Sequence, residues 1–564
     1  MGMDDYTSRY TKGLALEHAY HWERTRGDKP WLVQPVGNGE VRALTWAQGM
    51  AEARRMAAHL RSLDLPPASN IAIISKSTAH WILTDLAIMM AGHVSVPLYS
   101  TANAQTIRQI LDHSAAKLLF VGKLDSVAAV TEGAPAIAKI ALPLAPPPSQ
   151  LDAPQWADVI ARHEPLTDSP VRKPDELATI VYTSGSTGVP KGVMVTFGAI
   201  ARAVIGLDSI YKTSPDDRML SHLPLAHVAE RWVVECGSLF GGIQVFFPES
   251  LETFLTDLRR ARPTLFFTVP RIWQKFQLGV FSKLPPAKLD RLLRIPLVGR
   301  FVRKKILRQL GLGDVWLAAG GAAPMPADML SWYRRLGLQL LEGYGMTENF
   351  GYSHGNRIGR VRPGYVGEPL PGVEHRIADD GEVQVKSPGM MTGYYKDPDL
   401  TAQTFTADGW LRTGDRGELD AENRLRITGR VKELFKTSKG KYVSPAPIEN
   451  LLANHPFIEA VCVSGAGRPQ PHALIMLGED ARKRAANGDR TAIEASLAAH
   501  LTAVNAQLES HETLAFAAVV RDVWQPDNGF LTPTLKIKRA EIERAYEASL
   551  DGWYETKQPV VWQG

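Results

Sequence analysis

The sequence contains little cysteine: Cys236 and Cys462 are the two cysteines among 564 residues. Two thiols cannot build a disulfide framework or a four-cysteine zinc site, which disfavours metal–thiolate chemistry and fits a reducing compartment. The sequence also lacks an uninterrupted apolar stretch near the ~20 residues that a membrane-spanning helix needs. Its first residues, MGMDDYTSRYTKG, do not show the basic and then apolar order of a secretory signal. We therefore expect a cytoplasmic protein, and any membrane association would be peripheral.

The chain also lacks a strong charge of either sign. Its 64 Lys and Arg residues nearly balance 59 Asp and Glu residues, which gives a net charge of +5. That value is small for the length and does not resemble the electrostatic footprint of a nucleic-acid-binding protein. A single hydrophobic core stops growing near ~250–300 residues, so 564 residues predict at least two domains.

Short β-rich runs alternate with helix-like segments along most of the chain. NIAII (70–74), KLLFV (117–121) and TLFFTV (264–269) are typical of buried strands, and residues 46–63 have the spacing of an amphipathic helix. This alternation predicts an α/β fold with helix-covered parallel sheets. From residue 352 onward, turn-punctuated short strands indicate a β-rich subdomain. We predict a large N-terminal domain over residues 1–430 and a small α+β C-terminal domain over residues 431–564.

The stretch YTSGSTGVPKG (182–192) combines three glycines, five hydroxyl side chains and one lysine directly after an apolar run. Small residues let the backbone approach a ligand, and hydroxyls with exposed N–H groups can surround phosphate oxygens. A kinase or GTPase P-loop is disfavoured because Lys191 is followed by glycine, not by the Ser or Thr that binds magnesium. By itself the stretch is also compatible with a flexible surface loop.

Further polar groups follow predicted strands, at the sheet edge where open α/β sheets bind ligands. Tyr344 in EGYGMTE can stack on a planar base, and Thr347 with Glu348 can supply oxygens to a phosphate-bound magnesium ion. Asp415 in LRTGD is placed to accept the hydroxyls of a ribose. Taken singly, each of these residues has an ordinary structural explanation.

Seven motifs occur in order: YTSGSTGVPKG, LPLAHVAER, GGAAP, YGMTE, LRTGD, GRVKELFKTSKGKYVSP and LTPTLKIKR. Together they resemble the adenylate-forming superfamily, which contains acyl-CoA synthetases, luciferases and peptide-synthetase adenylation domains. The resemblance covers roughly residues 44–539 and implies ATP, Mg²⁺ and coenzyme A as co-substrates and metal activator. It also implies that the C-terminal domain is mobile.

The resemblance assigns a role to each matching residue. Lys191 and the loop before it would hold the β- and γ-phosphates of ATP, while Thr347 and Glu348 would serve the α-phosphate and the metal. Tyr344 and the Gly321–Ala322 backbone would contact adenine, and Asp415 with Arg430 would bind ribose. The phosphate-loop contacts are Thr183, Ser184, Gly185, Ser186, Thr187 and Gly188.

The C-terminal motif implies a two-step mechanism. Lys536 would bridge the carboxylate and the α-phosphate in the first half-reaction, and the neighbouring Lys538 is the competing assignment because Thr534 and Leu535 replace the family's usual Ser/Thr-Gly. Rotation of the C-terminal domain about Lys432 would then remove the lysine and admit a thiol. Lys436 and Gly440 belong to the segment that would line the approach of coenzyme A.

Several motifs resemble the long-chain fatty acyl-CoA synthetase branch, in which His227 would lie near the acyl carboxylate. We therefore predict a fatty acid–CoA ligase acting on medium to long chains. The segment NFGYSHGN (349–356) departs from the pattern of the branch, so the length and decoration of the preferred acyl chain stay open. The sequence also leaves the oligomeric state open. The alternatives are transfer of the acyl group to a carrier protein or its cyclisation, and a scaffold without catalysis.

Residues 288–308 carry eight basic residues and one acid, interleaved with apolar residues at helix-compatible spacing. Such a face suits an anionic membrane surface on the inner side of the membrane. The competing interpretation is a solvated basic helix that packs on the core.

Overall fold

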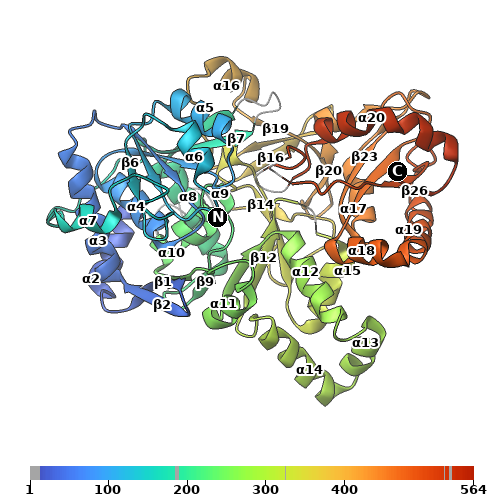
Figure 1. The fold of residues 1–564 in the computed structure, drawn as a ribbon, viewed down its shortest axis with the longest axis horizontal. Coiled ribbons are helices and arrows are strands. Elements are labelled where there is room, and N and C mark those ends of the chain that lie inside the picture. Colours follow the sequence, from blue (N-terminus) through green and yellow to red (C-terminus); the bar gives the residue numbers. More distant parts are fainter. Residues whose placement is uncertain (1–12, 185–189, 324, 526–527, 533–535) are drawn as a thin grey trace.

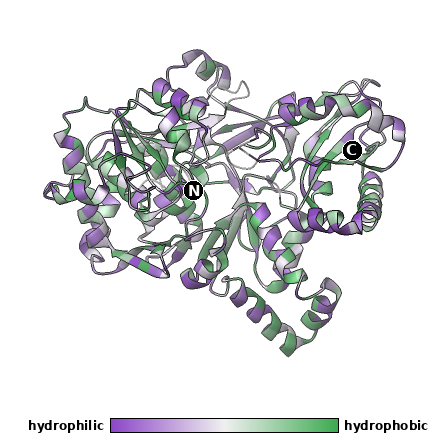
Figure 2. Cartoon of the chain, in the orientation of Figure 1, coloured by the Kyte–Doolittle hydropathy of each residue, from purple (hydrophilic) through white to green (hydrophobic). Residues whose placement is uncertain are grey.

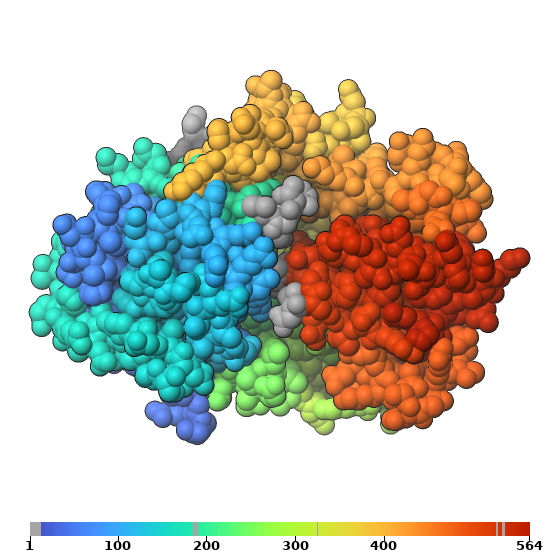
Figure 3. All heavy atoms as spheres, turned by 45° about the horizontal axis from the view of Figure 1, so that its top comes forward, coloured from blue at the N-terminus to red at the C-terminus, as the bar shows by residue number. Residues whose placement is uncertain are grey.

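The computed structural model describes residues 13–184, 190–323, 325–525, 528–532 and 536–564. It confirms the predicted α/β fold class: helix-covered sheets form the larger part of the molecule, and a separate lobe contains the C-terminal residues (Figure 1). In the space-filling view this lobe lies beside the rest of the chain across a groove (Figure 3).

The largest sheet has seven strands. In order across the sheet they are β18 (Gly393–Tyr394), β8 (Pro190–Thr196), β7 (Leu177–Ser184), β4 (Val94–Leu98), β3 (Asn70–Ile74), β5 (Leu118–Val121) and β6 (Lys139–Ala141). The five strands from β7 to β6 are parallel, whereas β8 and β18 are antiparallel to their neighbours. In β3, Ile71 and Ile73 enter one hydrophobic core and Ala72 and Ile74 enter another. The sheet is therefore buried on both faces, which explains the continuous apolar run in its sequence.

Two further sheets complete the α/β part of the N-terminal domain. The first is β2 (Glu40–Thr45), β1 (Pro30–Gly37), β10 (Gln244–Phe246) and β9 (Arg218–Leu220). The second is β11 (Leu265–Thr268), β12 (Leu317–Gly321), β13 (Leu340–Tyr344), β14 (His354–Gly355) and β15 (Glu368–Pro369). Strands β11, β12 and β13 are parallel, so the motifs that follow β12 and β13 emerge at the same edge.

Helices cover these sheets. Helix α3 (Trp46–Ser62) begins at a capping box, in which Thr45 accepts from the Gln48 backbone and Gln48 accepts from the Thr45 backbone. The other helical segments are α2 (Ala15–Thr25), α4 (Ala79–Met90), α5 (Ala104–Ser114), α6 (Ala128–Gly133), α7 (Trp156–Ala161), α8 (Phe197–Tyr211), α9 (Val228–Glu230), η1 (Arg231–Cys236), α10 (Gly237–Gly241), α11 (Phe254–Ala261), α12 (Pro270–Phe281), α13 (Pro286–Arg294), α14 (Pro296–Gln309), α15 (Ala327–Leu336) and η2 (Thr347–Asn349).

Residues 288–308 form parts of two helices. Pro296 opens α14 directly after α13, because a proline lacks the N–H that continuation of α13 would use. The α13–α14 hairpin projects from the body of the molecule (Figure 1) and presents hydrophobic residues on its helices (Figure 2). Leu289, Leu293 and Ile306 anchor it in a core shared with α15.

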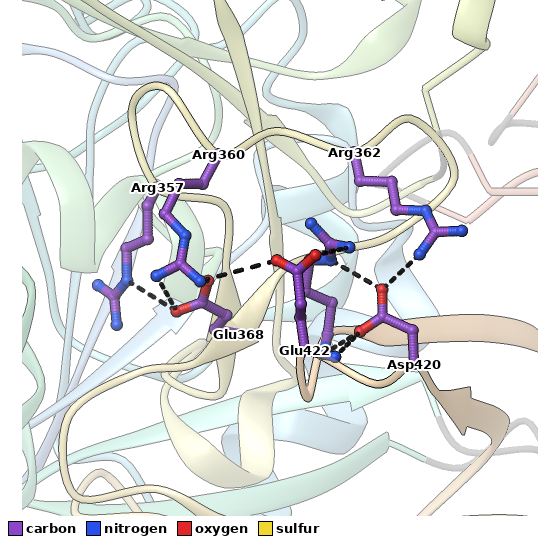
Figure 4. Close-up of polar contacts among 7 residues, drawn as sticks. Arg357, Arg360, Arg362, Glu368, Asp420 and Glu422 are labelled. Carbon is purple, nitrogen blue, oxygen red and sulfur yellow. Dashed lines mark hydrogen bonds and ion pairs between the residues drawn. The ribbon is translucent and has the colours of Figure 1, made fainter.

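The predicted β-rich subdomain is an antiparallel sheet. Its strands are β16 (Glu374–Ile377), β17 (Glu382–Lys386), β19 (Leu411–Leu419) and β20 (Leu425–Arg430), with α16 (Pro398–Thr404) between β17 and β19. Ion pairs tie its β19–β20 turn to the chain before it (Figure 4). Asp420 pairs with Arg362 at 2.7 Å and Arg424 at 2.8 Å, and Arg360 pairs with Glu368 of β15 at 3.0 Å.

The C-terminal residues have their own hydrophobic core, built between residues 443 and 561. We predicted the domain boundary at residue 430, which is where β20 ends. The elements that follow are η3 (Val431–Glu433), β21 (Phe435–Lys436), β22 (Tyr442–Val443), α17 (Pro445–Leu452), β23 (Ile458–Ser464), β24 (His472–Leu477), α18 (Glu479–Arg484), η4 (Ala485–Asp489), α19 (Arg490–Asn505), β25 (Ala517–Val519), α20 (Arg539–Thr556) and β26 (Val560–Trp562). Across the described ranges, no helix combines the length and apolarity needed to cross a bilayer.

Candidate active site

A cavity of about 2120 Å³ lies where the ends of several N-terminal strands meet the C-terminal domain. Its lining includes the end of β7, the start of β8, the residues after β12 and β13, and Lys536 from the C-terminal domain. The sequence motifs therefore converge, although they are separated by up to several hundred residues.

Lys191, Glu348 and Tyr394 form one cluster on this cavity. The Lys191 Nζ atom lies 3.2 Å from Glu348 Oε1 and donates to the Tyr394 hydroxyl at 2.8 Å. The Tyr394 hydroxyl donates to the same Glu348 oxygen at 2.6 Å. Burial and the Glu348 carboxylate raise the pKa of Tyr394, so the phenol keeps the proton that it donates. Sequence reasoning missed Tyr394, which reaches the site because β18 pairs with β8.

The predicted phosphate loop is partly described. Thr183 and Ser184 end β7, and Lys191 pairs with Thr183 across the β7–β8 hairpin. Thr183 lines the cavity, and its buried Oγ1 atom has no hydrogen-bond partner among the residues that the structure describes. The remaining predicted contacts, Gly185, Ser186, Thr187 and Gly188, lie outside the described residues.

Tyr344, Asp415 and Arg430 form the second polar cluster. The Tyr344 hydroxyl donates to Asp415 Oδ2 at 2.7 Å, and Arg430 Nε donates to Asp415 Oδ1 at 2.8 Å. Asp415 and Arg430 are cross-strand partners in β19 and β20, which fixes their approach. Burial raises the pKa of Asp415 although the neighbouring Arg430 charge opposes the shift.

The backbone at the end of β12 is exposed to the cavity. A Cβ atom on Gly320 would lie 2.9 Å from the Thr268 carbonyl, and one on Gly321 would lie 3.0 Å from the Gly343 carbonyl. Glycine therefore allows three parallel strands to end in close contact. The next residue, Ala322, has a left-handed φ of 69°, an uncommon conformation for a residue with a side chain.

Lys536 and His227 approach the cavity from opposite domains. Lys536 is exposed to the cavity, and its pKa is lowered by partial removal from water and by the Arg430 charge. Burial and the Lys536 charge lower the pKa of His227 to about 4, so its ring is neutral at neutral pH. His227 Nδ1 accepts from the Ala229 backbone at 3.1 Å, which places the ring proton on Nε2. Lys538 also borders the cavity.

The remaining predicted residues differ in whether they line the cavity. Thr347 and Lys432 border the cavity. Lys436 and Gly440 belong to the β21–β22 hairpin, are exposed, and are not part of the cavity lining. The Lys436 Nζ atom lies 5.6 Å from the centre of the Tyr442 ring instead. In this orientation of the C-terminal domain, Phe435 at the start of the segment predicted for coenzyme A lines the cavity, whereas Lys436 and Gly440 do not.

Glu342 is a second residue that sequence reasoning missed, although it begins the quoted motif EGYGMTE. It lines the cavity and is 5% exposed. Its Oε1 accepts from the Met325 backbone at 3.1 Å, while the buried Oε2 has no partner within the described part of the chain. Burial raises the pKa of Glu342 to about 7, so this carboxyl group changes protonation near neutral pH.

An apolar wall continues from the polar end of the cavity. It follows α9, η1 and α10, which run without interruption from His227 to Gly241. Further apolar lining comes from α8, β9 and β11. The cavity thus joins a cluster of charged groups to a surface that suits a hydrocarbon chain.

Comparisons with known proteins agree with this arrangement. A family model described as AMP-binding enzyme matches residues 19–395, and one described as AMP-binding enzyme C-terminal domain matches residues 433–558. The chain is 30% identical to the long-chain-fatty-acid–CoA ligase FadD15 of Mycobacterium bovis, over 94% of this chain and 96% of the relative. It is also 30% identical to human long-chain-fatty-acid–CoA ligase 1, over 87% and 79% of the two chains.

Solved structures share the fold. The adenylation domain of a carboxylate reductase from Mycobacterium chelonae superposes with a TM-score of 0.81 at 22% identity, covering 98% of this chain and 93% of that chain. The anthranilate CoA ligase AuaEII, in complex with anthranoyl-AMP, has a TM-score of 0.77 at 21% identity, covering 96% and 98%.

Proposed function

This chain belongs to the AMP-binding enzyme family, and on that premise we propose that it joins long-chain fatty acids to coenzyme A at the expense of ATP. The reaction is fatty acid + ATP + CoA giving acyl-CoA + AMP + diphosphate, through an acyl-adenylate. The relatives named long-chain-fatty-acid–CoA ligase match nearly the whole chain and support this activity. The structural observation that carries the proposal is one cavity with a charged end and an apolar wall.

In the first half-reaction a carboxylate oxygen attacks the α-phosphorus of ATP. The new O–P bond replaces the bond between the α-phosphorus and the bridging oxygen, and diphosphate leaves with that oxygen. Two anions must meet in line, so fixed positive groups and donors at the reacting atoms lower the barrier. Lys536 supplies the mobile cation, and the His227 Nε2–H group supplies a neutral donor to the incoming carboxylate.

The nucleotide would be held by the groups around the two polar clusters. Asp415, which lies beside Arg430, would accept hydrogen bonds from the ribose hydroxyls. Tyr344 and the backbone at Gly321 and Ala322 would contact adenine. The β- and γ-phosphates lie against Lys191 and the glycine-rich loop. The buried and unpartnered Thr183 Oγ1 is the described atom that most directly favours this placement, because a phosphate oxygen would satisfy it.

The residues present fit a magnesium ion carried by the nucleotide. No cluster of three or more His, Cys, Asp or Glu side chains occurs in the part of the chain that the structure describes, which disfavours a cage of protein ligands. Magnesium usually takes one or two carboxylates together with substrate phosphates. Glu348 and Thr347 would hold it, and the ion would neutralise the charge of the departing diphosphate. Lys191 and Tyr394 both contact Oε1 of Glu348 and so fix the carboxylate that would hold the ion.

In the second half-reaction the thiol of coenzyme A attacks the acyl carbonyl and AMP leaves. Lys536 lines the cavity, whereas Lys436 and Gly440 of the β21–β22 hairpin are not part of its lining. The described orientation therefore suits adenylation, and thioester formation requires a rotation of the C-terminal domain. Lys432, in the short η3 turn directly after β20, is the proposed hinge.

The projecting α13–α14 hairpin is proposed as a peripheral contact with an anionic membrane surface. Leu297 is 84% exposed and Phe301 is 68% exposed, and both lie among exposed basic residues such as Arg300 and Lys304. Apolar residues surrounded by positive charge suit the headgroup region of a bilayer, from which a fatty acid is taken. Co-sedimentation with anionic vesicles checks this contact: L297D/F301D should abolish binding, and undiminished binding would contradict it.

Fatty-acid-dependent release of AMP, measured with and without coenzyme A, tests the proposed function. We expect diphosphate exchange that depends on a fatty acid, and acyl-CoA formation that depends on free coenzyme A. Exchange without any thioester would instead favour transfer to a carrier protein or cyclisation. The absence of both reactions across a panel of fatty acids would favour a scaffold and refute the proposal.

A further inference from the structure

One continuous helical segment forms the apolar wall of the cavity. The middle of the segment, η1, is a π-helix. The residues of the segment that line the cavity are Val228, Ala229, Trp232, Val233, Val234, Gly237, Phe240 and Gly241. An α-helical rise of ~1.5 Å per residue would place Gly237 about 15 Å along the segment from His227, and the wider π-helix of η1 makes this an upper limit. His227 marks the end where the carboxylate reacts, which places Gly237 beside a distal part of a long acyl chain.

The opposite face of this segment is fixed to the protein core. Arg231 is fully buried and binds Asp85 of α4 at 2.5 Å and Glu235 of η1 at 3.1 Å. It also donates to Ser95 of β4 and Thr179 of β7. The segment is thereby attached to the largest sheet by charged hydrogen bonds, so its backbone cannot move away to accommodate a new side chain.

Gly237 is not required by the backbone conformation. Its φ of −55° and ψ of −42° are ordinary helical values. Glycine in a helix costs roughly 1 kcal/mol relative to alanine, so its presence calls for a spatial reason. A Cβ atom at Gly237 would find only ordinary contacts, 3.7 Å from Met219 Cε and 4.0 Å from the Trp232 carbonyl. Met219 also lines the cavity, so a side chain at Gly237 would project into the space between them.

The neighbouring glycine, Gly241, is different. Its Cβ atom would lie 3.1 Å from Thr213 Oγ1 and 3.2 Å from Ile243, both of which line the cavity. Gly241 is therefore needed for close packing at the end of the wall, whereas a Cβ atom at Gly237 would meet no tight contact.

We infer that Gly237 is a specificity-determining position, whose missing side chain keeps the cavity wall beside Met219 clear for the distal part of a long acyl chain. This inference rests on the proposed fatty acid–CoA ligase activity. A larger residue at this position would close the passage to long chains and leave the reacting end of the cavity unchanged. Short acids would then still be activated.

The test compares kcat/KM for butyrate, octanoate, dodecanoate and hexadecanoate in wild type, G237A, G237L and G279L. Gly279 is a matched control because it is an exposed glycine inside α12, away from the cavity, with open space at its Cβ. In G237L we expect hexadecanoate activation to fall about 100-fold relative to octanoate or butyrate, the scale on which a filled apolar pocket discriminates. G237A should show a smaller effect in the same direction, and G279L should leave the length profile unchanged.

A uniform loss at all chain lengths in folded G237L, or an unchanged profile, would overturn the inference. Thermal unfolding identifies a variant that fails to fold, and in that case the length profile of G237A decides, since one methyl group makes only ordinary contacts. Failure of the proposed function is distinguishable, because wild type would then show no fatty-acid-dependent activity before any variant is compared.

Discussion

An ion pair between Arg271 of α12 and Glu459 of β23 joins the two domains in the described orientation. One turn further along α12, Gln274 donates to the Ala453 backbone at 3.2 Å. Both contacts would break if the C-terminal domain rotated for thioester formation. We predict that R271Q weakens the adenylation orientation relative to the thioester-forming one.

The expected size of the effect of R271Q follows from the solvent exposure of the Arg271 and Glu459 side chains. Arg271 is 30% exposed and Glu459 is 20% exposed, so solvent screens the pair only in part. Pairs near the upper end of the surface range contribute about 1 kcal/mol, which corresponds to about a fivefold change in the balance of the two orientations. R271Q should therefore slow adenylation up to fivefold where that orientation is limiting, and it should not slow thioester formation from supplied acyl-AMP.

Diphosphate exchange measures the first step, and conversion of chemically supplied acyl-AMP to acyl-CoA measures the second. A double-mutant cycle provides the control: in an E459Q background, R271Q should have little further effect, because the partner charge is already absent. Arg482 lies 3.9 Å from Glu459, so E459Q alone can exceed R271Q. If R271Q slows both half-reactions in the same proportion, the ion pair does not discriminate between the orientations and the reasoning is wrong.

Three further predictions concern individual charged groups. K536A should lower the rate of adenylation by on the order of 10²–10³, the scale for loss of one preorganised group. It should still convert supplied acyl-AMP to acyl-CoA at nearly the wild-type rate. Normal adenylation in K536A together with a loss in K538A would assign the role to Lys538 instead. E348A should depress diphosphate exchange and overall thioester synthesis together while the protein stays folded, and retained exchange would exclude its proposed role with magnesium. Burial raises the pKa of Glu230 from 4.5 to about 8, so the folded state holds this proton more tightly than the unfolded state. Its contribution to stability is present below pH 4.5 and is lost as the pH rises toward 8. The thermal unfolding temperature of E230Q should accordingly fall less steeply between pH 5 and 9 than that of wild type. Equal slopes of unfolding temperature against pH would contradict the raised pKa of Glu230.

Much of the fold could be predicted from the sequence because its signals are local. After Asn70 the run NIAII is apolar because β3 is buried on both faces, and it forms a buried strand as expected. We did not predict the break at Pro296 in residues 288–308, although it follows from the covalent structure of proline. The family and the reaction class could also be predicted, since seven ordered motifs carry more information than any one of them.

The site could be predicted only in part. The motif residues Tyr344, Glu348 and Asp415 were identified as candidates because glycine and turn residues mark the ends of strands. Tyr394 was missed because it reaches Glu348 through strand pairing, with no local signal in its own sequence. The separation of Lys436 from the cavity depends on the orientation of the C-terminal domain, which no local pattern encodes.

The sequence by itself determined the order of the strands and helices, the chemistry offered at each strand end, and the family to which the chain belongs. Only the tertiary structure decided which of these groups meet. The pKa of Glu230 is raised because the fold buries it, and Arg271 contacts Glu459 because the two domains pack together. Gly237 and Met219, from separate elements, line the same cavity because the fold brings α10 and β9 together. Burial, long-range pairing and cavity shape arise from contacts between residues far apart in the chain, whereas propensity and motif spacing are properties of neighbouring residues.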